Sequence, residues 1–380
     1  MKICLTVNSS PWSKFKGGGQ IAVHHLATAL SRKGHEVHAL YSKSSGELVN
    51  PPQGNYKIHW VRHFNLNTLN LNIFSFARTL GPLAEQEHFD IIHGNAEEAY
   101  FSAGICRKIN AACFFTSHAP FIPRTGIFGG LSNPIFLLKR LNAYLLRAAA
   151  DSAQHIITFS QFSKTLVTGG LGPVSEEKVY VIPPGIEPTW NEVTRSPSPK
   201  NQLLFWGRME DEKGVPELLQ AFAQVKPQNP ETRLHLIGEG NRQDAYRQLA
   251  KELAIDSHAV FHGWLPTADI QRLAAESLAG VFPSRIESFG LAPVEAQAAG
   301  LPVICTNAGA LPESVQDGIG GTVVPTGNVK SLTDAIQNLL SHPEKHEILA
   351  RVAREPVRQN FSWDSAADKL LILYAEARRE

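Results

Sequence analysis

The apolar residues of this chain alternate between two spacings. Short apolar runs at Lys2–Val7 and Glu36–Tyr41 have the composition of buried β-strands, whereas Ala22, Leu26 and Leu30 between them recur at helical spacing. The same alternation predicts five further strands in the first half of the chain, at 58–61, 91–93, 113–117, 156–159 and 179–182. Strands that alternate with helices favour parallel sheets with helices on both faces.

The alternation breaks after residue 182, at a stretch rich in Pro and Ser, NEVTRSPSPKN, which is typical of a connector between domains. It then resumes and predicts six strands, at 203–206, 234–237, 259–262, 280–282, 302–305 and 321–324. Helices are predicted between them at 216–225, 244–253, 270–275, 293–299 and 332–340, and 363–379 also has helical periodicity. We therefore expect two doubly wound, Rossmann-like α/β domains, at 1–185 and 186–362, with a cleft between them where ligands bind beyond the carboxyl ends of the strands.

Composition supports two ordinary globular domains. The 380 residues exceed a comfortable single core, and 36 Lys and Arg against 35 Asp and Glu give a net charge of +1, so we expect no nucleic-acid partner. No apolar run is long enough to span a membrane, and the N-terminal MKICLTVN resembles a strand more than a signal peptide. Four cysteines without ligand-like spacing indicate a reducing, cytoplasmic environment.

Three glycines, Gly17, Gly18 and Gly19, stand before the first predicted helix. With Ala22 they match G-x-G-x-x-A, but a long loop precedes them and no acidic residue follows the second strand, so a dinucleotide site is poorly supported. Glycines at a helix N-terminus let backbone amides approach an anion closely. A plain flexible loop is an equally good interpretation of these residues.

A second candidate is 205-FWGRMEDEKGVPELLQAF, in which Arg208 and Lys213 follow a predicted strand. Two cations at the carboxyl end of a parallel strand suit a diphosphate, Arg by bidentate contact and Lys as a point charge. The alternative is a solvated loop in which both cations pair with the neighbouring Glu210, Asp211 and Glu212.

A third candidate is 284-SRIESFGLAPVEAQAAGLPV, between a predicted strand and a predicted helix. Glu287 lies in the loop, and Phe289, Gly290 and Leu291 offer amides near the helix N-terminus, where the helix dipole favours a negative group. Glu295, about one turn further on, could accept hydrogen bonds from two vicinal hydroxyls such as those of a ribose. Alternatively, it only complements the helix dipole.

These segments together resemble the retaining glycosyltransferases of family 4, which have the GT-B fold. The string ESFGLAPVEAQAAGLPVICTNAGALPESVQDGIGGTVVP resembles the E-x7-E region of that family, and FWGRMEDEKGVPELLQAF its G-R-x-x-x-x-K-G segment. GGGQIAVHHLATALSRKGHEV resembles its N-terminal glycine loop, and LHLIGEG its next strand and loop. The likeness runs in order over nearly the whole chain and is strongest at about 200–325.

The resemblance implies a role for each matching residue. Arg208 and Lys213 would hold the donor diphosphate, Glu287 the hydroxyls of the transferred sugar and Glu295 the ribose. The loop at 17–19 would close over the diphosphate.

His118, in 116-TSHAPF, would reach the donor sugar. Trp264 could contact the base or be an ordinary surface or core aromatic. The chain departs from the family at 93-HGN, where H-x-H is common, so a role for a second imidazole there is in doubt. It also departs at 309-GALPE, where the family has G-G-x-P-E, which would alter the shape of the site floor near Glu313. The expected catalytic residues are Glu287, His118, Arg208 and Lys213, and the expected donor-binding residues are Gly17, Gly18, Gly19, Arg208, Lys213, Gly238, Trp264, Phe289, Gly290, Leu291 and Glu295.

The implied reaction transfers a hexose from a nucleotide diphosphate sugar with retention, and the leaving diphosphate acts as base. The sequence has no DxD to suggest a metal, so we expect neither a metal nor a cofactor. UDP-glucose is the expected donor and GDP-mannose the second choice; a glycan or lipid-linked molecule in polysaccharide or glycoconjugate biosynthesis is the expected acceptor. By the same likeness, the helix at 363–380 would pack back on the first domain.

Several alternatives stay open from the sequence. A sugar-nucleotide epimerase and a glycosyl phosphorylase share the fold, a non-catalytic nucleotide-sugar binding protein would share the site, and an NAD-dependent oxidoreductase is disfavoured by the long first loop. The segment 135-IFLLKRLNAYLLR is either an amphipathic helix packed on the sheet or a peripheral contact with the inner face of a membrane.

Overall fold

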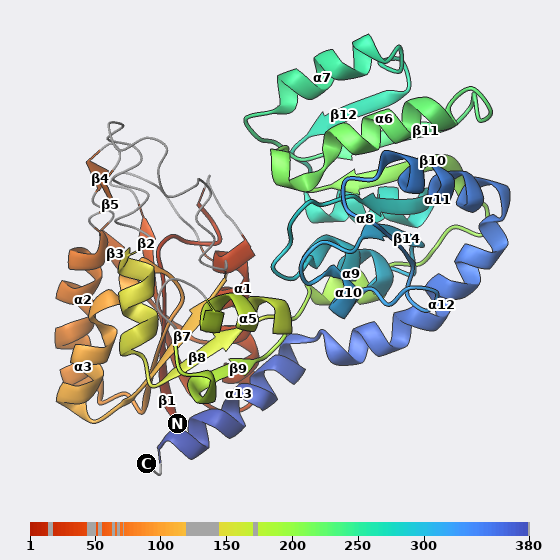
Figure 1. The fold of residues 1–380 in the computed structure, drawn as a ribbon. Coiled ribbons are helices and arrows are strands. Elements are labelled where there is room, and N and C mark those ends of the chain that lie inside the picture. Colours follow the sequence, from red (N-terminus) through yellow and green to blue (C-terminus); the bar gives the residue numbers. More distant parts are fainter. Residues whose placement is uncertain are drawn as a thin grey trace. The chain divides into compact units, whose positions relative to one another are not determined.

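A computed structural model describes residues 1–13, 18–43, 51, 55–62, 65–66, 69–70, 72–118, 144–169 and 174–378. The chain forms two compact units (Figure 1). Unit 1 comprises Met1–Gly185 together with Trp363–Glu380, and unit 2 comprises Ile186–Ser362. The two termini therefore belong to the same unit.

Unit 1 is built on a parallel sheet of seven strands in the order β3-β2-β1-β6-β7-β8-β9. The strands are β1 (Lys2–Val7), β2 (Glu36–Lys43), β3 (Lys57–Arg62), β6 (Ile91–Gly94), β7 (Ala112–Ser117), β8 (His155–Thr158) and β9 (Val179–Val181). A short antiparallel pair, β4 (Asn65–Leu66) with β5 (Leu69–Asn70), stands apart from this sheet. The order reverses direction at β1, as expected for a doubly wound fold.

Helices cover both faces of this sheet because side chains along a buried strand point alternately to opposite faces. Ile3 and Leu5 of β1 pack into the apolar cluster that contains α1 and α13, whereas Cys4 packs into the cluster that contains α2 and α3. The helices are α1 (Gly18–Arg32), α2 (Asn72–Glu87), α3 (Ser102–Ile109), α5 (Gln161–Gly169) and α13 (Trp363–Ala377). The C-terminal helix α13 thus completes the core of the unit that holds the N-terminus (Figure 1).

Unit 2 repeats the architecture with a parallel sheet of six strands in the order β12-β11-β10-β13-β14-β15. The strands are β10 (Lys200–Trp206), β11 (Arg233–Ile237), β12 (Ala259–Gly263), β13 (Ser277–Phe282), β14 (Val303–Thr306) and β15 (Thr322–Val324). The direction reverses at β10, so β10 and β13 form the switch point where α/β sheets bind ligands. The predicted class of two Rossmann-like parallel-sheet domains is confirmed.

The helices of unit 2 are α6 (Val215–Val225), α7 (Gln243–Glu252), α8 (Thr267–Glu276), α9 (Leu291–Ala298), α10 (Leu311–Ser314), α11 (Val329–Ser341) and α12 (Pro343–Asn360). Helix α12 was not predicted from the sequence. Its buried positions include two alanines, Ala350 and Ala353, and Pro356 lies inside it, so the usual signal of large apolar residues at helical spacing is weak.

The predictions about membrane contact and about the cysteines concern particular parts of the chain. None of the helices in the described part of the chain is long and apolar enough to cross a membrane. Of the apolar segment 135–147, residues 135–143 lie outside the described residues, and residues 144–147 are helical. All four cysteines are buried and unpaired.

Candidate active site

The candidate site in unit 2 is organised by the turn that leads into α9. Gly290 has φ of +91°, and a Cβ atom there would lie 2.5 Å from Cδ2 of Leu311, so only glycine fits without rearrangement. The backbone NH of Ala310 donates to the carbonyl oxygen of Glu287 over 3.0 Å, which ties the loop 309-GALPE to this turn. No side chain of the described residues caps α9. Its first amides are therefore available to an anion.

A second loop brings Lys213 to this turn. Lys213 ends a 3-10 turn, Asp211–Lys213, after β10. The next residue, Gly214, has φ of +66°, and a Cβ there would lie 1.9 Å from the carbonyl oxygen of Pro283. This close approach of two loops places Nζ of Lys213 2.5 Å from Oε2 of Glu287.

The ion pair between Lys213 and Glu287 is largely enclosed, since the two side chains are 19% and 16% exposed. The sequence analysis placed Lys213 with a diphosphate and Glu287 with sugar hydroxyls, and the alternative paired Lys213 with its sequence neighbours. In the structure Lys213 instead contacts the other predicted functional residue. The structure therefore brings these two predicted residues to one place.

Arg208 lies differently. Its side chain is 62% exposed and its Nη2 donates to Oε1 of Glu212 over 2.6 Å. This is one of the local pairs that the solvated-loop alternative predicted. Asp211 is engaged by Arg242, which donates to its two carboxylate oxygens over 2.8 to 3.0 Å. A surface pair of this kind contributes little stability, so Arg208 can reorient at little cost.

Glu295 lies in the second turn of α9, as predicted, and its carboxylate is held by a tryptophan. Nε1 of Trp206 donates to Oε2 of Glu295 over 2.8 Å. Glu295 is half-buried, and burial of its carboxylate raises the pKa of Glu295 to about 7; the nearby Glu187 acts in the same direction. With one oxygen held by the indole, the other is available to a hydroxyl.

Trp206, which contacts a predicted site residue, was not itself predicted from the sequence. It ends β10, its ring stacks on Trp190 at 5.5 Å between centroids and 8° between planes, and it meets the edge of Phe282. Because these two aromatic contacts hold the ring in place, the indole NH of Trp206 orients the carboxylate of Glu295 more strictly than a mobile hydrogen-bonding side chain would. The sequence did carry a signal for this role: a tryptophan, whose indole NH is polar, is the last residue of a buried strand and directly precedes Gly207 and Arg208.

The other predicted donor-binding residues of unit 2 are Phe289, Leu291, Gly238 and Trp264. The side chain of Phe289 is buried against Phe361, so only its backbone can face a ligand, and Leu291 is the first residue of α9. Gly238 follows β11 with φ of +129°, and a Cβ there would lie 1.8 Å from the carbonyl oxygen of Gly207. Gly238 thus has a packing requirement of its own. Trp264 follows β12 and is 56% exposed.

In unit 1, the structure brings the end of the glycine loop to His118. Gly17 lies outside the described residues, and Gly18 is the first residue of α1, so the first helix begins within the glycine run rather than after it. A Cβ on Gly19 would lie 3.5 Å from Nδ1 of His118, and His118 follows β7 directly. Gly19 and His118, which were predicted separately as donor-site residues, therefore lie next to each other.

The departure at 93-HGN explains how His118 is oriented. Nδ2 of Asn95 donates to the carbonyl oxygen of Thr6 over 3.0 Å, so its Oδ1 is the atom that faces Nε2 of His118 at 2.9 Å. His118 must then carry its proton on Nε2, an assignment that follows from the hydrogen-bond network. Burial lowers the pKa of His118 to about 4, so the ring is neutral at pH 7.

Behind Asn95 lies a carboxyl group that was not predicted. Oε1 of Glu98 accepts from Oγ1 of Thr6 and from the backbone NH groups of Asn95 and Ala96, each over 3.1 Å. Burial raises the pKa of Glu98 to about 7. His93 is also buried, between the hydroxyls of Tyr374 and Thr116, so it serves the core.

Three potential metal ligands, Glu36, His38 and Glu87, lie within 4.8 Å of one another. They stand at the amino end of the unit 1 sheet, opposite His118. The carboxylates of Glu36 and Glu87 are engaged by Lys57 and Lys2 over 2.7 and 2.9 Å. This cluster is already charge-compensated, and no role in the candidate site follows from it.

Family models match both halves of the chain. Residues 16–190 match the model Glycosyltransferase Family 4, and residues 187–355 match the model Glycosyl transferases group 1. The alignment with the glycogen synthase of Mycobacterium tuberculosis is 395 positions long, gaps included, with 28% identity, and it covers 96% of this chain and 92% of that protein.

Solved structures of the same architecture cover almost the whole chain. The sucrose-phosphate synthase of Thermosynechococcus elongatus superimposes with a TM-score of 0.79 at 20% identity, covering 99% of each chain. Anabaena HepE in complex with UDP gives a TM-score of 0.76 at 20% identity, covering 99% of this chain and 100% of that one. HepE has also been solved with UDP-glucose, and that complex gives 0.73 at 19% identity.

Each family model falls largely on one of the two units, and the two together leave only short ends unmatched. The protein is therefore an enzyme of the glycosyltransferase class with the GT-B fold. It combines a domain of the Glycosyltransferase Family 4 type with a domain of the Glycosyl transferases group 1 type.

Proposed function

We propose that this enzyme transfers a hexose from a nucleotide diphosphate sugar to an acceptor with retention of the anomeric configuration, and that UDP-glucose is the donor. HepE, a structural neighbour, has been solved with UDP and with UDP-glucose. Membership of the retaining family 4 enzymes is part of the proposal, and it is supported by the spacing of Glu287 and Glu295 around a glycine turn.

The observation that carries the proposal is the set of groups at the β10–β13 switch point. Lys213 and the amides at the start of α9 offer positive charge for a diphosphate, and Glu287 offers a carboxylate for sugar hydroxyls within 2.5 Å of that lysine. Glu295, fixed by Trp206, suits the paired hydroxyls of a ribose. Diphosphate, sugar and ribose are three of the four chemical parts of a nucleotide sugar, and the fourth is the base. Arg208 would join the diphosphate after leaving Glu212.

The chemistry proposed for this site is mostly positioning and charge stabilisation. The bond between C1 of the sugar and the diphosphate oxygen breaks, and a new bond from C1 to the acceptor oxygen forms on the same face. The acceptor proton passes to the leaving diphosphate, whose growing charge Lys213, Arg208 and the α9 amides stabilise. In this scheme the protein side chains and amides supply the positive charge that a metal ion supplies elsewhere. His118, neutral and oriented by Asn95, would contact the donor sugar.

The acceptor is proposed only as a class, a glycan or a lipid-linked molecule in polysaccharide or glycoconjugate assembly, and the enzyme would work in the cytoplasm or at the inner face of the membrane. An epimerase, a phosphorylase or a non-catalytic binding protein would share the nucleotide-sugar site. Incubation with the donor, with and without a separate acceptor, distinguishes them, because only a transferase shows acceptor-dependent release of the nucleotide.

A panel of nucleotide sugars tests the donor. Ligand stabilisation grows with concentration relative to the dissociation constant, so UDP-glucose should raise the melting temperature more than GDP-mannose or ADP-glucose at equal concentration. The shift should be smaller in Glu295→Gln and unchanged in Glu276→Gln, which alters a surface glutamate of unit 2 that pairs with Lys200. Equal shifts in the two variants would remove Glu295 from the site, and a larger shift with another donor would replace UDP-glucose.

A further inference from the structure

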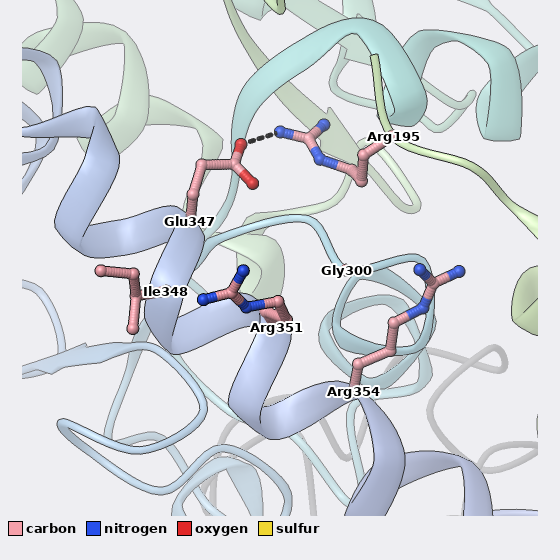
Figure 2. Close-up of a pocket in the computed structure, with 6 residues that line it drawn as sticks. All are labelled: Arg195, Gly300, Glu347, Ile348, Arg351 and Arg354. Atoms are coloured by element: carbon pink, nitrogen blue, oxygen red, sulfur yellow. Dashed lines mark hydrogen bonds and ion pairs between the residues drawn. The ribbon is translucent and has the colours of Figure 1, made fainter. Parts of the chain in front are cut away.

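A pocket of about 240 Å³ lies in unit 2 at the end of α9 opposite to Gly290 (Figure 2). It is lined by Arg195, Gly300, Glu347, Ile348, Arg351 and Arg354. Three guanidinium groups and one carboxylate give the lining a formal charge of +2. Figure 2 shows the three arginines distributed around the turn at Gly300, two of them from α12 and one from the irregular segment before β10. The proposed donor site uses none of these residues.

Two of the arginines are fixed in place by the fold. Arg195 donates through Nη1 to the carbonyl oxygens of Ala274 and Ser277 over 2.5 and 2.7 Å, and it also pairs with Glu347. Nε of Arg354 donates to the carbonyl oxygen of Ala298, the last residue of α9, over 3.0 Å. Because backbone carbonyls carry no net charge, these bonds position Arg354 without neutralising it, whereas Glu347 compensates the charge of Arg195.

The side chain of Arg351 and the buried Nε of Arg195 make no hydrogen bond within the described part of the chain. Arg351 is exposed and makes no hydrogen bond or ion pair with any residue that the structure describes. Nε of Arg195 is buried and has no acceptor within the same described ranges. A buried donor without an acceptor calls for a ligand or a bound water, because such groups are rarely left unsatisfied.

We propose that this pocket is a second anion site of the enzyme, built for a dianion of the phosphate class such as a phosphate monoester. Guanidinium groups approaching from different directions suit a tetrahedral oxyanion better than a planar carboxylate, which one arginine can hold by itself. The volume equals that of about eight water molecules at ~30 Å³ each, which leaves room for a small group beyond the phosphate. Ile348, 52% exposed at the pocket, offers an apolar contact for that group.

Arg351→Ala is the decisive variant, since Arg351 supports no other described residue and its loss should leave the fold intact. Isothermal titration with inorganic phosphate should show binding to the wild type and at least tenfold weaker binding to Arg351→Ala. Lys345→Ala removes one positive charge from an exposed position on the same helix and should bind as the wild type does. Arg208→Ala, which alters the proposed donor site, should also leave phosphate binding unchanged.

Phenyl phosphate distinguishes an ester from free phosphate. If the ester group lies on Ile348, phenyl phosphate should bind the wild type more tightly than inorganic phosphate, and Ile348→Ser should remove only that difference. Equal affinity of the two ligands in the wild type would reduce the site to one for free phosphate and overturn the monoester assignment.

The site itself is overturned if the wild type binds no phosphate at millimolar concentration. It is also overturned if Arg208→Ala abolishes the binding while Arg351→Ala keeps it. Both outcomes are independent of whether UDP-glucose is the donor.

Discussion

Replacing Glu287 by glutamine should make the enzyme bind UDP more tightly and use UDP-glucose less well. In the structure Nζ of Lys213 is 2.5 Å from Oε2 of Glu287, so a diphosphate must compete with that carboxylate for the lysine. UDP has no sugar for Glu287 to hold, and the carboxylate therefore only opposes its binding. UDP-glucose has a sugar, and for this ligand the proposed hydroxyl contact of Glu287 is lost in the variant.

The size of the effect follows from the enclosure of the pair. Exposed ion pairs contribute about 0.2–1 kcal/mol, and breaking fully buried ones costs about 3–5 kcal/mol. With side chains 19% and 16% exposed, Lys213 and Glu287 fall between these limits. We therefore expect UDP affinity to rise about tenfold, or 1.4 kcal/mol, in Glu287→Gln. Turnover of UDP-glucose should fall at least tenfold, since a hydrogen bond to a charged group contributes about 1.5–3 kcal/mol.

Isothermal titration with UDP measures the first effect, and release of UDP from UDP-glucose measures the second. Glu276→Gln, which removes a carboxylate from a surface pair of the same unit, should change neither. Unchanged or weaker UDP binding by Glu287→Gln would refute the reasoning. Lys213→Ala should instead destabilise unit 2 by about 1–3 kcal/mol, because it leaves the carboxylate enclosed without a cation, and adding Glu287→Gln should recover most of that loss.

Three further predictions concern residues that hold other groups in place. Because burial raises the pKa of Glu295 to about 7, the ionised fraction rises from ~9% at pH 6 to ~91% at pH 8, so UDP-glucose affinity should increase about tenfold over that range and become independent of pH in Glu295→Gln. The free energy of unfolding should change with pH in the opposite direction. A raised carboxyl pKa contributes stability at low pH, and this contribution is lost as the pH rises through about 7. Chemical denaturation at pH 5 and pH 8 measures the difference in the wild type and should show its loss in Glu295→Gln. Trp206→Phe keeps the stack on Trp190 but removes the indole NH, so titration should show UDP binding about tenfold weaker than in the wild type, whereas Trp190→Phe should bind UDP normally. Asn95→Leu removes the acceptor that orients His118, so kinetic assays should show turnover of UDP-glucose about fivefold lower with UDP affinity unchanged; a matching loss of UDP affinity would argue against a role at the sugar.

The strands and most helices were predictable because each carries a strong local signal. Lys2–Val7 and Leu234–Ile237 are apolar runs bounded by breakers, and both are strands in the structure. Helix α12 was missed because alanines at 350 and 353 make its buried face and Pro356 interrupts its pattern. Local periodicity does not reveal a helix with a buried face of small residues, because the elements that it packs against come from distant parts of the chain.

The candidate site was predictable as a set of residues but not as a set of contacts. The order of motifs along the chain indicated Lys213, Glu287 and Glu295, and these lie at one switch point. The pairing of Lys213 with Glu287 could not be predicted from the sequence, because that contact depends on the approach of Gly214 to Pro283 across two loops. Such approaches are set by tertiary packing, which spacing along the chain does not encode.

The central claim is retaining transfer from UDP-glucose, and the anomeric configuration of the first product tests it most directly. Proton NMR of the enzyme with UDP-glucose and no acceptor follows the slow hydrolysis of the donor, in which water replaces the acceptor. The account predicts that α-glucose and UDP appear together, with the β anomer growing only later by mutarotation. Initial release of β-glucose would contradict retention, and the absence of UDP release under conditions in which another nucleotide sugar is consumed would contradict the donor.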